Sequence, residues 1–95
     1  MQEQENRKII NCINKSTNFF EILSIDCNVN VEEITKAYRI LSIKVHPDKN
    51  DGLDEATEAF KKLNSAHECL IDEKERKRYH ESLIKVDFLS FLDLW

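Results

Sequence analysis

Three consecutive residues, His46, Pro47 and Asp48, have the types and order best suited to chemistry in this chain. A proline holds its φ at about −65° and donates no backbone hydrogen bond, so it would stiffen a bend between the imidazole and the carboxylate. A His–Asp pair can act as an acid–base dyad, but no serine, cysteine or other nucleophile is obviously arranged with this one. The three residues therefore predict a rigid, polar and accessible projection that recognises a partner.

The residues around this turn add polar surface to it without completing a reactive site. Lys49 and Asn50 are expected to extend that surface. His67 and His80 have no useful ligand spacing to His46, so we expect neither a metal site nor a cofactor. A helical hairpin of this size also offers little concave volume for a substrate. We therefore expect a binding protein that has no catalytic residues, and not an enzyme.

A helix with a well-marked start is expected to lead into the turn. Asn30 fits its N-cap, and Glu33 stands at the capping-box position three residues on. Val29 and Ile34 are placed to form a hydrophobic staple across this cap. The helix should end just before Pro47, because the residue that precedes a proline disfavours the α conformation. Its core face is defined by apolar residues at helical spacing: Ile34, Ala37, Tyr38, Leu41 and Val45.

A second long helix is expected after the turn. Asp54 and Glu55 open it, where acidic side chains favour the positive end of the helix dipole. Its apolar positions show the clearest helical periodicity of the chain: Ala56, Ala59, Phe60, Leu63, Ala66, His67 and Leu70. Two such helices joined by a short connection should pack as an antiparallel hairpin, which places the turn at its tip.

Shorter elements are expected on either side of the hairpin, at residues 6–13, at residues 19–23 and from Asp72 onward. Asn18 or Thr17 can cap the second of these, and Glu75 stands at the capping-box position of the last. The charged run 74–78 is expected to be a solvated helix face. Hydrophobic residues make up 41% of the chain and charged residues 34%, with one Gly and one Pro, which favours a single all-α domain.

The composition also limits the classes of function. A net charge of −4 argues against nonspecific binding to nucleic acids or anionic membranes. Cys12, Cys27 and Cys69 form no CxxC pair, so we expect reduced thiols and no zinc site. The start of the chain does not resemble a signal peptide, and no apolar run approaches a membrane span. We expect a cytoplasmic monomer. A nuclear location stays open, and so does an organelle or membrane context if the chain is a fragment.

Five segments of the chain follow, in order, the pattern of a known family. They are residues 18–23 (NFFEIL), 31–39 (VEEITKAYR), 44–50 (KVHPDKN), 56–64 (ATEAFKKLN) and 77–79 (KRY). Together they resemble the J-domain of the DnaJ co-chaperone family. The resemblance divides the chain into an N-terminal helical extension at 1–17, a J-domain at 18–81 and an apolar and acidic tail at 82–95.

The resemblance implies a four-helix fold whose two long helices form an antiparallel finger. It also implies that His46, Pro47 and Asp48 stimulate ATP hydrolysis by a DnaK-type heat-shock chaperone, and that the basic face of the preceding helix docks on an acidic surface of that partner. The other partner-binding residues that it assigns to this chain are Lys36, Arg39, Lys44 and Lys49. We expect Tyr38 to face the core and to place its hydroxyl near the docking surface, and we count it with the partner-binding residues. The alternatives are an inert J-like scaffold for protein–protein interaction, a nucleic-acid-binding helical domain and, last, a hydrolase built on the His–Asp pair.

This chain departs from the family pattern at several positions. Ser24 replaces a common glycine, Val45 a common aromatic residue and His67 a common tyrosine. Thr35 and Ile40 stand where many members are basic, so the expected docking face is sparser than usual. We expect His67 to be a packed residue of the helix interface.

The tail carries four large apolar residues, Phe88, Phe91, Leu92 and Trp95. It is expected either to fold back on the domain or to bind a partner or client protein. The family's glycine/phenylalanine-rich region and cysteine-rich zinc domain are both absent from this sequence, which argues against client binding by this chain.

Overall fold

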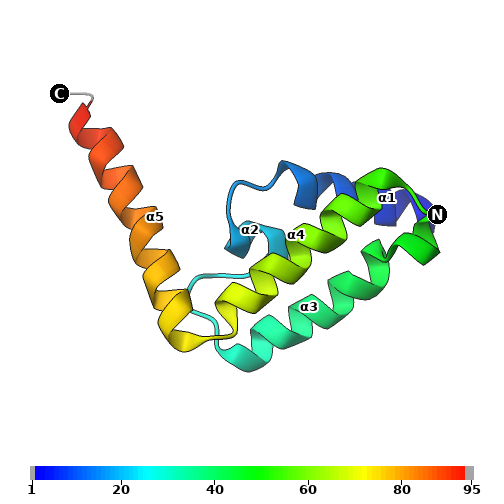
Figure 1. Ribbon diagram of the computed structural model, residues 1–95, viewed down its shortest axis with the longest axis horizontal. Helices are drawn as coiled ribbons and strands as arrows, with labels where there is room; N and C mark the ends of the chain where they lie inside the picture. The colour runs from blue at the N-terminus through cyan, green and yellow to red at the C-terminus, as the bar shows by residue number, and fades with distance from the viewer. Residues whose placement is uncertain (1, 94–95) are drawn as a thin grey trace.

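The computed structural model describes the backbone of residues 2–93 and the side chains of residues 4–85. Every regular element in this part of the chain is helical, which confirms the predicted all-α class (Figure 1). The elements are α1 (Gln2–Lys15), α2 (Phe19–Leu23), α3 (Val31–Val45), the short 3₁₀ helix η1 (Pro47–Asn50), α4 (Asp54–Leu70) and α5 (Glu73–Asp93).

Helices α3 and α4 form the predicted antiparallel hairpin, with η1 at its tip (Figure 1). Its centre consists of fully buried residues at the predicted positions: Ile34 and Val45 of α3, and Ala56, Ala59, Leu63, Ala66 and Leu70 of α4. Three of the five α4 residues are alanines, which leave room for large side chains of the neighbouring helices. Ala37, Tyr38, Leu41, Phe60 and His67 are only partly buried. The first four of these residues pack against the buried core, so the predicted core face is confirmed there, with margins that are only partly buried.

The helix boundaries follow the signals in the sequence. The Asn30 side chain caps α3 by accepting a hydrogen bond of 2.9 Å from the Glu33 backbone N–H. Asp72 caps α5 in the same way, accepting from the N–H groups of Lys74 and Glu75 at 2.9 and 3.1 Å. Helix α3 ends at Val45, because the residue before Pro47 takes an extended conformation with ψ of 132°.

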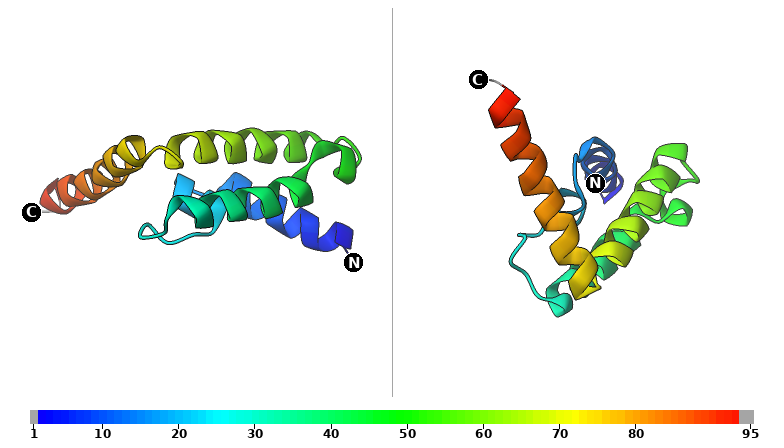
Figure 2. Two further views of the ribbon diagram at one scale, coloured as in Figure 1. Left: turned by 90° about the horizontal axis from the view of Figure 1, so that it is seen from below. Right: turned by 60° about the vertical axis from the view of Figure 1, so that its left-hand side comes forward.

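Helix α1 is longer than the predicted segment 6–13, and it packs against both α3 and α4. Figure 2 shows α1 and α2 on one side of the hairpin. Ile10 and Ile13 of α1 are buried in the common core. The Asn14 side chain donates to the Glu55 carbonyl at 3.0 Å, and the Lys62 ammonium donates to the Asn14 carbonyl at 3.1 Å. Polar contacts thus fasten the C-terminal end of α1 to α4.

Helix α2 is capped by Asn18, whose side chain accepts from the Glu21 N–H at 2.9 Å. It ends at Ser24, which has a left-handed φ of 55°. This conformation favours glycine, since only glycine adopts it without a steric cost. Ser24 still closes the helix, because its N–H donates to the Glu21 carbonyl at 3.0 Å.

Helix α5 leads away from the other helices in both Figure 1 and Figure 2. Tyr79 attaches its beginning to α2. The Tyr79 ring stacks on Phe19 with centroids 4.6 Å apart, and its hydroxyl oxygen accepts the Phe19 N–H at 2.9 Å. The charged run in α5 is a solvated face as expected, with exposed pairs Lys77–Glu73 at 3.5 Å and Arg78–Glu75 at 3.6 Å. The exception is Arg76, which is partly buried and donates to the Leu70 carbonyl at 2.7 Å.

Candidate functional site

The backbone of the turn at the hairpin tip is closed by its own hydrogen bonds. The His46 carbonyl accepts the Lys49 N–H at 3.0 Å, and the Pro47 carbonyl accepts the Gly52 N–H at 2.8 Å. Asp51 and Gly52 both have positive φ values, 56° and 65°, and these reverse the chain into α4. Two successive left-handed residues are costly unless one is glycine, which accounts for the single glycine of the chain at this point.

Asn50 holds the turn against the end of α3. Its side-chain amide donates to the Lys44 carbonyl at 3.0 Å and to the His46 carbonyl at 2.9 Å. Carbonyls at a helix C-terminus have no partner within the helix, and Asn50 supplies one. The residue is only 5% exposed, so the prediction that it extends the polar surface is wrong. The sequence places an amide near these carbonyls, but it does not show that Asn50 points inward while Lys49 points outward.

His46 and Asp48 have different environments. The Nδ1 atom of His46 accepts a hydrogen bond of 3.1 Å from the Asp48 backbone N–H, and the ring packs edge-on against Phe60 with centroids 5.2 Å apart. In its neutral form the ring then carries its proton on Nε2. The Asp48 side chain is 93% exposed and that of His46 is 44% exposed. The imidazole is therefore held in place, whereas the carboxylate is almost fully exposed to solvent.

The two side chains do not form an acid–base dyad. The distance from His46 Nδ1 to Asp48 Oδ2 is 3.9 Å, which is too long for a hydrogen bond. The lone pair of Nδ1 is already engaged by the Asp48 backbone N–H, so the nearby carboxylate is not paired with this nitrogen. A general base needs a hydrogen bond that orients it, and this geometry provides none from the Asp48 carboxylate.

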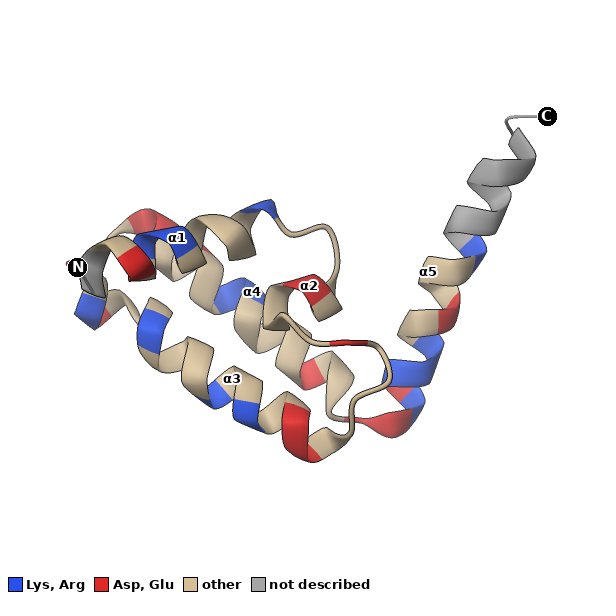
Figure 3. Cartoon of the chain, turned by 180° about the vertical axis from the view of Figure 1, so that it is seen from behind, with Lys and Arg blue, Asp and Glu red and all other residues tan. Residues whose placement is uncertain are grey.

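The predicted basic residues lie on the outer surface of α3. Lys36, Arg39 and Lys44 are exposed, and Lys49 is exposed on η1. Figure 3 shows that positive residues follow α3 from its middle to the turn, whereas its start is acidic. None of the ion pairs among the described side chains involves these four residues. The positive charges are thus available to a partner.

Tyr38 lies between α3 and α4. Its ring stacks on His67 with centroids 4.0 Å apart, and its hydroxyl donates to the Asn64 side chain at 2.6 Å. His67 is thus a packed residue of the helix interface, as expected, and burial lowers its pKa below the ordinary value of 6.5. The hydroxyl of Tyr38 is already held by α4, so a direct part for Tyr38 in docking stays a prediction.

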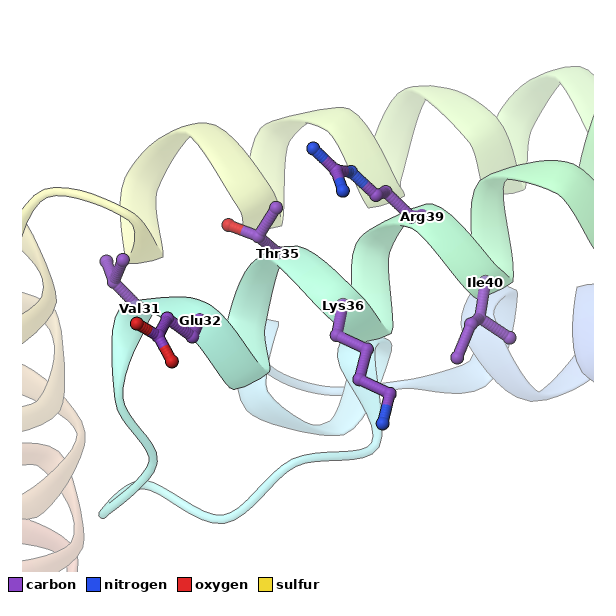
Figure 4. Close-up of a pocket in the computed structure, with 6 residues that line it drawn as sticks. All are labelled: Val31, Glu32, Thr35, Lys36, Arg39 and Ile40. Carbon is purple, nitrogen blue, oxygen red and sulfur yellow. The ribbon is translucent and has the colours of Figure 1, made fainter.

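An open groove of about 500 Å³ runs along the outer side of α3. It is lined by Val31, Glu32, Thr35, Lys36, Arg39 and Ile40 (Figure 4). Its lining mixes charged ends with aliphatic surface. Sequence reasoning treated Ile40 only as a missing basic residue, and did not mark Ile43, which is also exposed.

No group of three or more His, Cys, Asp or Glu side chains within residues 4–85 is arranged to hold a metal ion. Among the helices as described, none combines the length and the apolar character needed to cross a bilayer.

Comparison with known proteins identifies the family of this chain. The family model of the DnaJ domain matches residues 18–80, and the chain therefore belongs to the DnaJ family, as the resemblance predicted. It is 48% identical over 61 residues to a chaperone protein DnaJ of Wolinella succinogenes, covering 64% of this chain and 16% of that protein. It is 40% identical over 85 residues to chaperone protein dnaJ 49 of Arabidopsis thaliana, covering 90% of this chain and 24% of that protein.

A third relative, the DnaJ protein ERDJ3B of Arabidopsis thaliana, is 39% identical over 70 residues, which cover 74% of this chain and 20% of that protein. The chain thus corresponds to a quarter or less of the length of these three relatives. The DnaJ domain that the family model matches, residues 18–80, includes the turn.

Proposed function

We propose that this chain is a co-chaperone that docks on a DnaK-type heat-shock chaperone and stimulates its ATP hydrolysis through His46, Pro47 and Asp48. The observation that carries the proposal is the construction of the turn. Asn50 and the backbone bonds hold it in one conformation, and the Asp48 carboxylate is almost completely exposed. A preorganised turn loses little conformational entropy when it binds, so more of the contact energy remains for the partner.

Each part of the site has a separate role in this proposal. The positive residues of α3 steer the chain to an acidic surface and raise the rate of encounter. Asp48 then forms a charge-assisted contact with a basic group of the chaperone, for which an arginine fork is the best geometric match. The chemistry of hydrolysis takes place in the chaperone. This chain accelerates it by binding the hydrolytic conformation more tightly than the resting one.

Single-turnover ATP hydrolysis by a DnaK-type chaperone, with and without this chain, tests the proposal. His46→Gln and Asp48→Asn should each abolish the stimulation, while circular dichroism shows unchanged helical content. Lys85→Gln, on the exposed surface of α5, is a matched control and should stimulate normally. Stimulation that survives both substitutions in the turn would refute the role given to it. A wild-type chain that binds the chaperone without stimulating it would favour the inert scaffold instead.

The tail contributes a second, separate proposal, that it binds a partner or client protein. Its four large apolar residues lie beyond residue 85, outside the described side chains, while the backbone of α5 continues as a helix to Asp93. Deletion of residues 86–95 tests this against folding back on the domain. An unchanged melting temperature together with lost client binding would support the proposal, whereas a lower melting temperature would count against it.

A further inference from the structure

The outer face of α3 carries an exposed apolar pair inside its basic stripe. Ile40 is 46% exposed and Ile43 is 57% exposed, and the two are three residues apart on the helix. Residues three and four positions apart are neighbours on a helix surface. Lys36 and Lys44 therefore lie one turn before and after Ile40, and Arg39 lies one turn before Ile43. The pair is thus bordered by three cations.

The isoleucine pair lies close to the turn formed by His46, Pro47 and Asp48. Ile43 precedes His46 by three residues, which is about 4.5 Å along a helix axis at 1.5 Å per residue. Figure 4 shows Lys36 and Ile40 leaving α3 on the same side, next to the groove described above. A partner that contacts both the basic residues and the turn must therefore also cover the two isoleucines.

We infer that Ile40 and Ile43 determine which chaperone this chain recognises, by matching an apolar patch that is bordered by acidic residues on the chaperone's docking surface. This inference rests on the function proposed above, and it adds the chemistry of the partner's surface. A partner surface that is acidic throughout would desolvate its carboxylates against two aliphatic side chains without any compensating contact. An apolar centre with an acidic border gives the two isoleucines an apolar contact and gives the three cations around them an opposite charge.

Charge makes a second copy of this chain a poor occupant of the face. A symmetric dimer through α3 would place Lys36, Arg39 and Lys44 against their own copies, and like charges across an interface are strongly unfavourable. Two half-exposed isoleucines also supply far less area than a stable dimer needs. The observations therefore favour a partner that brings opposite charge and a small apolar patch.

The test measures binding to the DnaK-type chaperone of the same organism by fluorescence anisotropy, and ATP hydrolysis in parallel. The double variant Ile40→Ser/Ile43→Ser should weaken binding about tenfold, because it removes apolar area that the partner covers. Its maximal stimulation at saturation should equal that of the wild type, since the turn is intact. The matched control, Ile71→Ser/Ile84→Ser, removes isoleucines that are 40% and 55% exposed outside α3 and should bind like the wild type.

The change in affinity caused by a third variant distinguishes a partner surface with an apolar centre from one that is acidic throughout. Ile40→Lys adds a further basic residue in place of an isoleucine of the pair, and it should weaken binding if the partner is apolar at this point. Tighter binding by Ile40→Lys, or unchanged binding by the double serine variant, would overturn the inference. Lost co-sedimentation with anionic phosphatidylserine vesicles in the double variant, with chaperone binding unchanged, would assign the face to a membrane and overturn it as well.

These outcomes are distinct from failure of the proposed function. A wild-type chain that binds the chaperone through Ile40 and Ile43 but does not stimulate hydrolysis would refute the co-chaperone activity alone. A wild-type chain that does not bind the chaperone at all would refute both.

Discussion

Removal of the Asn50 side chain should loosen the turn without altering the three residues at its tip, His46, Pro47 and Asp48. Asn50→Ala eliminates two hydrogen bonds, to the carbonyls of Lys44 and His46, in a site that is 5% exposed. Each bond contributes about 1 kcal/mol, so the variant should lose about 2 kcal/mol of unfolding free energy. For a domain of this size that corresponds to a fall of roughly 10 °C in melting temperature.

The two carbonyls are not equally dependent on Asn50. The His46 carbonyl keeps the Lys49 N–H at 3.0 Å, whereas the Asp48 N–H that would continue the helical pattern to Lys44 is donated to His46 Nδ1 instead. Asn50→Asp should therefore be worse than Asn50→Ala, because it directs carboxylate oxygens at two carbonyl oxygens. We expect it to cost about 3 kcal/mol or more.

Urea unfolding of the wild type, Asn50→Ala and Asn50→Asp measures these losses, and single-turnover ATP hydrolysis measures their effect on stimulation. The half-saturating concentration should rise several-fold in both variants, because the turn is no longer preorganised. Asn28→Ala removes the same amide from an exposed loop position and should change stability by less than about 0.5 kcal/mol. If Asn50→Ala were as stable and as active as Asn28→Ala, the role given to Asn50 would be refuted.

Three further predictions concern residues outside the turn. Ser24→Gly should stabilise the fold by about 0.5–1 kcal/mol in urea unfolding, because glycine adopts the φ of 55° at this position without a steric cost; a loss of stability would contradict this. Burial lowers the pKa of His67 below 6.5, so around that pH the unfolded chain binds more protons at this residue than the folded chain does. The contribution of His67 to the free energy of unfolding is therefore complete above pH 6.5 and is lost as the pH falls below that value. His67→Phe, which keeps an aromatic ring against Tyr38, should lose less stability than the wild type between about pH 7.5 and 5.5 in urea titrations, and an equal loss in both proteins would exclude His67 as the source. Tyr79→Phe should cost about 1 kcal/mol, since the Phe19 N–H loses its acceptor while the ring stack remains, and Tyr79→Ala should cost clearly more; equal losses would mean that the stack contributes nothing.

Much of the hairpin could be predicted because its signals are local. The Asn30 and Asp72 caps and the bend before Pro47 act within a few residues of chain, and backbone sterics and capping hydrogen bonds determine them directly. The buried centre of α4 follows from the helical period alone. The motif at 46–48 was recognisable for the same reason, since its proline and its position between two helices are properties of consecutive residues.

The site itself depended on contacts between distant segments. The packing of the His46 ring against Phe60, the stack of Tyr38 on His67 and the hydrogen bond from the Phe19 N–H to Tyr79 join residues up to 60 positions apart. The full length of α1 also exceeded its local signal, because its burial against α3 and α4 stabilises turns that propensity alone would leave marginal.

The sequence by itself determined that this protein is helical, where its hairpin turns and which three residues stand at the tip. Only the tertiary structure decided that the amide of Asn50 locks that tip, that the Asp48 carboxylate is exposed while the His46 ring is held in place, and that two isoleucines lie among the basic residues on the outer face of α3. The physical reason is that helix formation and capping act over a few residues, whereas burial depends on how whole helices meet.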